Sequence, residues 1–132
     1  MKIVLLDVTV VDPTAKATLA AACKTRGHVA ELSAKKKHQH YDRYIDADRY
    51  VLVPAAVEVF GAACTELHSF IDSVASWSVA SGTGTQRRGS VIERWRRRIS
   101  FALQAGTSIV VDAAMRRSRP STGYNLYTTV SQ

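Results

Sequence analysis

The chain has 132 residues, of which 46% are hydrophobic and 22% charged, and its formal net charge is +7. This length predicts one domain, and the apolar content excludes an intrinsically disordered chain. No apolar stretch reaches the roughly 20 residues of a membrane span, and the first residues lack the pattern of a secretory signal peptide. The basic excess predicts a polyanionic partner, and we expect DNA or RNA rather than a membrane.

The number and spacing of the cysteines indicate the cellular compartment of the protein. Cys23 and Cys64 stand far apart and without C-x-x-C spacing, which argues against a zinc site and against a disulfide framework. We therefore expect reduced, buried thiols and an intracellular protein.

Two segments have the composition of β-strands. Residues 2–11 are almost continuously apolar, which predicts a strand buried on both faces. Residues 50–60 are rich in β-formers, and Pro54 within them indicates an edge position or a bulge. Because the first strand begins at residue 2, we expect that the chain starts inside a larger domain.

Helical stretches are expected over residues 15–26, 28–44, 65–79 and 90–117. Gly27 separates the first two, and Gly106 permits a break in the last. Apolar residues at helical spacing predict the buried faces of the last two stretches. These are Leu67, Phe70, Ile71 and Val74 in the third, and Ile92, Trp95, Ile99, Ala102 and Leu103 in the fourth.

The order of these elements predicts an α/β fold with a small mixed sheet flanked by helices. We expect one domain over residues 1–117 and a disordered polar tail over residues 118–132. Two strands are few for a stable sheet, so either a third strand escapes detection or part of the domain is absent.

One acidic residue interrupts the first apolar strand. A carboxylate in such a run is costly unless it is paired, hydrogen-bonded or bound to a metal, so Asp7 is the first candidate for a functional residue. The structural alternative is that Asp7 bridges or caps a neighbouring strand end. A basic cluster, residues 35–41, follows about thirty positions later.

Four segments occur in an order that resembles a known family: residues 6–13, 37–41, 53–61 and 95–106. Over residues 4–112 the chain is similar to the restriction-endonuclease-like segment found downstream of reverse transcriptase in retrotransposon polyproteins. The resemblance implies a PD-(D/E)XK nuclease core that hydrolyses DNA phosphodiester bonds with Mg²⁺. It also implies a nuclear location if the chain is expressed from a eukaryotic mobile element.

The resemblance assigns roles to particular residues. Asp7 matches the second carboxylate of the family and would be the metal ligand. Lys37 matches the catalytic lysine of a K-x-x-K-[HY] pattern, in which His40 replaces the second lysine. Lys36 is the alternative if the register shifts by one. In many relatives a lysine stands two residues after the carboxylate, where this chain has Thr9.

The family's first carboxylate lies upstream of the position where this chain begins. The resemblance therefore implies an N-terminally truncated core that lacks its first strand and is inactive as an isolated chain. The alternative function is a non-catalytic basic module that binds nucleic acid. Asp12 and Glu58 are the further acidic candidates for this site, although neither matches the missing carboxylate and we favour an exposed edge charge for Glu58.

The remaining candidates are basic or aromatic. We expect Lys36, Arg94, Arg97 and Arg98 to contact nucleic acid, because guanidinium and ammonium groups bind phosphate. A solvated helix face is the alternative for each of them. Residues i and i+2 of a helix point in different directions, so a shared metal at His38 and His40 is not expected. His38 and Asp42 are spaced to pair instead.

Overall fold

The computed structural model describes residues 2–82 and 87–118. Strands β1 (Ile3–Val11) and β2 (Tyr50–Glu58) form a two-stranded parallel sheet. The helices are α1 (Leu19–Ala22), α2 (His28–Tyr41), α3 (Thr65–Ala80) and α4 (Arg88–Ser118), and the short 3₁₀ helix η1 (Asp42–Tyr44) follows α2. The fold is α/β as predicted, although the two strands are parallel. Residues 119–132, which contain nearly all of the expected tail, lie outside the described residues.

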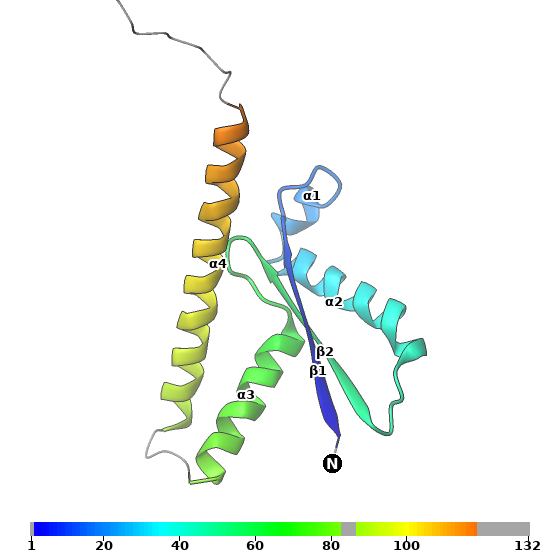
Figure 1. Cartoon of the computed structure of the whole chain (residues 1–132). Coiled ribbons are helices and arrows are strands. Elements are labelled where there is room, and N and C mark those ends of the chain that lie inside the picture. Colours follow the sequence, from blue (N-terminus) through cyan, green and yellow to red (C-terminus); the bar gives the residue numbers. More distant parts are fainter. Residues whose placement is uncertain (1, 83–86, 119–132) are drawn as a thin grey trace, which may run out of the picture.

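Helices lie on both faces of the sheet, with α2 on one side and α3 and α4 on the other (Figure 1). The register sets Asp7 opposite Pro54 and Val8 opposite Ala55. Because side chains alternate along a strand, Asp7 faces α2, whereas Val8 faces the helices of the other layer.

The α2 layer is packed through small side chains. Ala30 and Ala34 of α2 are buried against a cluster that includes Ala56 of β2. Small residues at i and i+4 allow the helix to approach the strand closely. The next inward position of the same stripe is Lys37, so a lysine lies where an apolar residue would continue the core.

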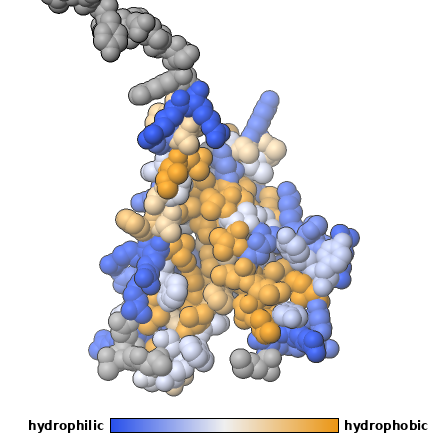
Figure 2. Space-filling view, viewed as in Figure 1, coloured by the Kyte–Doolittle hydropathy of each residue, from blue (hydrophilic) through white to orange (hydrophobic). Residues whose placement is uncertain are grey.

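The prediction that β1 is buried on both faces is wrong. Val4, Val8 and Val10 are 48%, 65% and 53% exposed, and the other apolar residues of the strand are also accessible. The helices pack mainly on β2, and no described residue pairs with the outer edge of β1. Figure 2 shows the resulting band of apolar side chains over the strands.

The outer edge of β2 is covered, in contrast to that of β1. The backbone N–H of Cys64 donates to the carbonyl of Ala56, and an antiparallel bridge joins Val57 to Ala63. The carbonyl of Pro54 accepts from Cys64 Sγ on this same outer edge. The backbone nitrogen of Pro54 faces the same edge, so the absence of its N–H removes no hydrogen bond between β1 and β2. The predicted edge position of Pro54 is confirmed, and the strand has no bulge there.

The helices differ from their predicted bounds at several points. The stretch expected over residues 15–26 is helical only in α1, because most of its length forms turns. Helix α4 is continuous through Gly106. The predicted stripe of α3 is confirmed, whereas Trp95 and Ala102 of α4 are exposed rather than buried. Cys64 is buried as expected, but Cys23 is exposed.

Candidate functional site

Asp7 and Lys37 form an ion pair between β1 and α2. Lys37 Nζ donates to Asp7 Oδ2, across a separation of 30 residues in the chain. The Lys37 side chain is 15% exposed and the Asp7 side chain 33% exposed. The structure thus brings together the two residues that the sequence assigned to one site.

The local structure explains why these two groups meet. Asp7 is on the side of the sheet that α2 covers, opposite Pro54. Lys37 continues the inward stripe of Ala30 and Ala34, so its aliphatic stem is covered and its ammonium group reaches the strand. The pair therefore replaces an apolar contact at the boundary of the core.

Asp7 retains one oxygen for a further ligand. Oδ1 has no hydrogen-bond partner among the described residues, and a third of the side chain is accessible. Mg²⁺ is often held by one or two carboxylates together with water and substrate phosphate. Within residues 2–82 and 87–118, no group of three or more potential metal ligands occurs.

The other acidic candidates take structural positions. Glu58 is 6% exposed, and its Oε1 accepts from the backbone N–H groups of Val29, at 3.0 Å, and Ala30, at 3.5 Å. The favoured expectation of an exposed edge charge is therefore wrong, because Glu58 caps the start of α2. Asp12 accepts from Thr14 in an exposed turn, and these hydrogen bonds lower the pKa of its carboxyl.

His38 joins α2 to α3. Its Nδ1 is 3.0 Å from Asp42 Oδ1 and its Nε2 is 2.9 Å from Glu66 Oε2, and the hydrogen bond with Glu66 is the main cause of its raised pKa. The predicted pairing with Asp42 is confirmed. The contact with Glu66 was not predicted, because it joins two helices and leaves no local pattern.

The basic candidates are divided between the two faces of the sheet. Lys36 lies on α2, beside Lys37, and is exposed. Arg94, Arg97 and Arg98 are exposed on α4, which lies on the opposite side of the sheet from α2 (Figure 1). Arg97 pairs with Glu93 at 2.7 Å. The α4 arginines are therefore not brought to the Asp7–Lys37 pair.

Comparisons with models of protein families, with curated proteins and with solved structures give no match to this chain. Within the described part of the chain, none of the helices has the length and hydropathy needed to cross a bilayer. Among the described residues, the Asp7 carboxylate thus has one oxygen without a partner, with the Lys37 ammonium group beside it and exposed lysines on the same helix. Such groups are suited to binding a cation and a phosphate together.

Proposed function

We propose that this chain binds nucleic acid and carries the cation–lysine part of a restriction-like, Mg²⁺-dependent DNA endonuclease site. The observation that carries the proposal is the ion pair of Asp7 and Lys37. The same pair was expected from the resemblance to retrotransposon endonuclease segments. An ion pair at the boundary of a core is by itself weak evidence for stability, because apolar residues of similar volume often replace such a pair without loss.

The groups have complementary tasks at a phosphodiester. Asp7 Oδ1 would hold the cation, which when bound supplies polarisation of a phosphate oxygen and of a water molecule. Lys37 places positive charge beside the same position, where negative charge develops on the phosphate. Lys35 and Lys36, exposed on the same helix, add charge that attracts the nucleic-acid backbone.

The single carboxylate limits what this chain is expected to do. A restriction-like site uses a second acidic ligand, and both Asp12 and Glu58 are engaged elsewhere. We therefore expect cation-assisted binding of DNA, with hydrolysis dependent on a further carboxylate. A non-catalytic basic module is the second candidate, and the net charge of +7 favours it equally well.

The two candidates differ in the response of DNA affinity to Mg²⁺. Simple charge attraction weakens when Mg²⁺ replaces monovalent salt, because divalent cations compete for phosphates. A cation bridging Asp7 to a phosphate has the opposite effect. The test is fluorescence anisotropy with a labelled DNA duplex at constant ionic strength, with and without Mg²⁺.

The wild-type chain is expected to bind DNA more tightly with Mg²⁺, and Asp7→Asn to lose this gain. Asp48→Asn is the control, since it removes the same charge at an exposed turn. Lys37→Met is expected to weaken binding in both conditions. If Mg²⁺ weakens the wild type and Asp7→Asn alike, the non-catalytic module is the correct function. If no salt-sensitive binding occurs, both candidates are wrong.

A further inference from the structure

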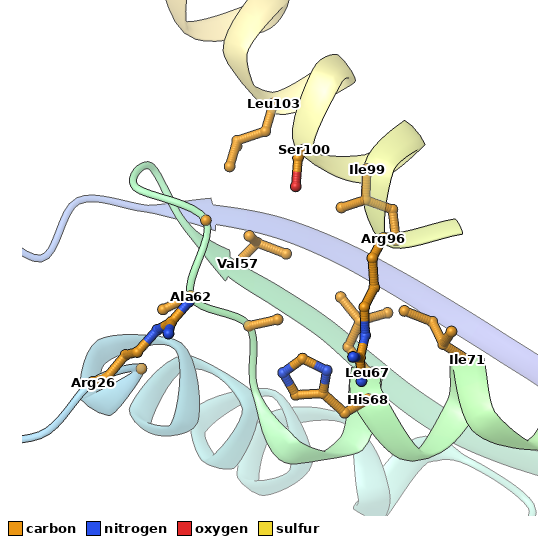
Figure 3. Close-up of a pocket in the computed structure, with 13 residues that line it drawn as sticks. Arg26, Val57, Ala62, Leu67, His68, Ile71, Arg96, Ile99, Ser100 and Leu103 are labelled. Carbon is orange, nitrogen blue, oxygen red and sulfur yellow. The ribbon is translucent and has the colours of Figure 1, made fainter. Parts of the chain in front are cut away.

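A cavity of about 540 Å³ opens between α3, α4 and the segments that precede α2 and α3 (Figure 3). Its floor is apolar and consists of Val57, Leu67, Ile71, Ile99 and Leu103. Polar side chains stand around this floor, namely Arg26, His68, Arg96 and Ser100. Residues of α3 and α4 make up most of this lining, which includes neither Asp7 nor Lys37.

The charged side chains that line the cavity are all positive among the described residues. Among the described residues that line it none is acidic, and neither Arg26 nor Arg96 has an ion pair or a side-chain hydrogen bond with the described residues. Three other arginines of α4 are paired, Arg88 with Asp72, Arg97 with Glu93 and Arg116 with Asp112, whereas Arg94, Arg98 and Arg117, like Arg96, have no ion pair among the described residues. Two free guanidinium groups at one cavity are complementary to an anion, and their planar donors suit phosphate or carboxylate.

The rest of the lining is suited to a flat organic group. The volume falls within the range of about 300–1,000 Å³ that is usual for small-molecule sites. The imidazole of His68 is exposed and has no partner among the described residues, so one of its faces is available for stacking. In Figure 3, Arg96 extends from α4 toward α3, where His68 and Leu67 lie.

We propose that this cavity holds one nucleotide of a single-stranded nucleic acid. The phosphate lies between Arg26 and Arg96, and the base lies over the apolar floor beside His68. A phosphate joined to a flat, partly apolar ring is the chemistry that this combination of groups recognises. The inference rests on the proposed function for its choice of nucleic acid, but it uses neither Asp7 nor Lys37.

The test is an NMR titration of the full chain with dTMP, thymidine and inorganic phosphate, followed at the amides of Gly61, Ala62 and Ala63. Both parts of the ligand contribute, so dTMP is expected to bind at least about tenfold more tightly than thymidine or phosphate alone. Similar affinities for dTMP and phosphate would overturn the proposal, because the floor would then have no role.

Two variants and one control locate the binding. Arg26→Ala with Arg96→Ala is expected to weaken dTMP binding about tenfold, whereas Arg49→Ala with Arg117→Ala, which removes the same charge elsewhere, changes it by less than about twofold. Ser100→Trp fills the cavity without changing charge and is expected to abolish binding. Equal losses in the two alanine pairs, or unchanged binding in Ser100→Trp, would contradict the assignment.

These outcomes separate the two proposals. Binding of dTMP without any Mg²⁺-dependent gain in duplex affinity would support the nucleotide cavity and refute the Asp7–Lys37 site. A gain that depends on Asp7, without dTMP binding, would refute the cavity alone.

Discussion

Asp7 of β1 and Lys37 of α2 form an ion pair at the two positions where apolar residues would complete the packing between sheet and helix. Lys37 follows Ala30 and Ala34 on the inward stripe of α2, and its side chain is only 15% exposed. A charge pair at the edge of a core costs desolvation energy, which its mutual attraction only partly offsets. The pair is therefore expected to contribute little net stability.

The contribution of the Asp7–Lys37 pair to the free energy of unfolding can be measured with single and double substitutions. Lys37→Met leaves Asp7 without a partner and is expected to lower the free energy of unfolding by about 1–2 kcal/mol, a moderate cost because Asp7 is partly accessible. Asp7→Leu with Lys37→Met is expected to restore wild-type stability or exceed it. Urea unfolding of the three proteins is the measurement. A double variant that is less stable than Lys37→Met would show that the pair is primarily structural.

Glu58 is expected to stabilise the start of α2. Glu58→Ala removes the acceptor for the N–H groups of Val29 and Ala30 and should cost about 1–3 kcal/mol. Glu93→Ala removes an exposed acid of α4 and is expected to change stability by less than about 0.5 kcal/mol. Urea midpoints of the two variants provide the comparison, and equal losses would contradict the capping role.

The raised pKa of His38 predicts that part of the free energy of unfolding depends on pH. Its pKa is raised above the ordinary value of 6.5 by Glu66 and Asp42, so the folded chain holds the proton more tightly than the unfolded chain. This contribution is fully present below pH 6.5 and is lost as the pH rises through the higher folded pKa.

The test compares urea midpoints at about pH 6 and about pH 8.5. The wild type is expected to lose stability between the two, and His38→Gln to lose less. His40→Gln is the control, because His40 contacts the rings of Tyr41 and Tyr44 and has no acidic partner within the described residues. A His38→Gln variant with the full wild-type loss would assign the pH dependence to other groups.

The open edge of β1 predicts self-association through strands. Most apolar side chains of β1 are exposed, and the strand contains neither lysine nor proline, the residues that would block pairing with another chain. Val8→Lys, at a side chain that is 65% exposed, is expected to reduce light scattering of concentrated protein.

Val110→Lys is the matched control for this effect. It adds the same charge at a valine that is 68% exposed, but on α4, where the backbone hydrogen bonds are satisfied within the helix. An equal reduction in both variants would assign the effect to net charge rather than to the strand edge.

The pairing of Asp7 with Lys37 was expected from the resemblance of the sequence to a known family, not from local periodicity, which accounts for it only once the structure is known. Alternation along β1 fixes the face of Asp7, and the i, i+4, i+7 stripe of α2 fixes the face of Lys37. The convergence of the two residues also required the parallel pairing of β1 and β2, which the strand–helix–strand order favours.

The burial of β1 was not predictable, because hydrophobicity shows what a strand is able to bury and not which neighbours it has. For Glu58, the partners are backbone N–H groups 28 and 29 residues away, and no sequence pattern reports them. The alanine-rich run of α1 has high helix propensity, yet a helix is costly to nucleate, and only four of its residues are helical.

The central claim, that Asp7 holds a divalent cation beside Lys37, is tested most directly by titration with paramagnetic Mn²⁺ observed by NMR. Amide signals of Leu6, Val8 and Thr9 are expected to broaden first in the wild type, and this broadening is expected to disappear in Asp7→Asn. Broadening confined to the exposed acidic turn of Asp46 and Asp48, or unchanged broadening in Asp7→Asn, would contradict the account.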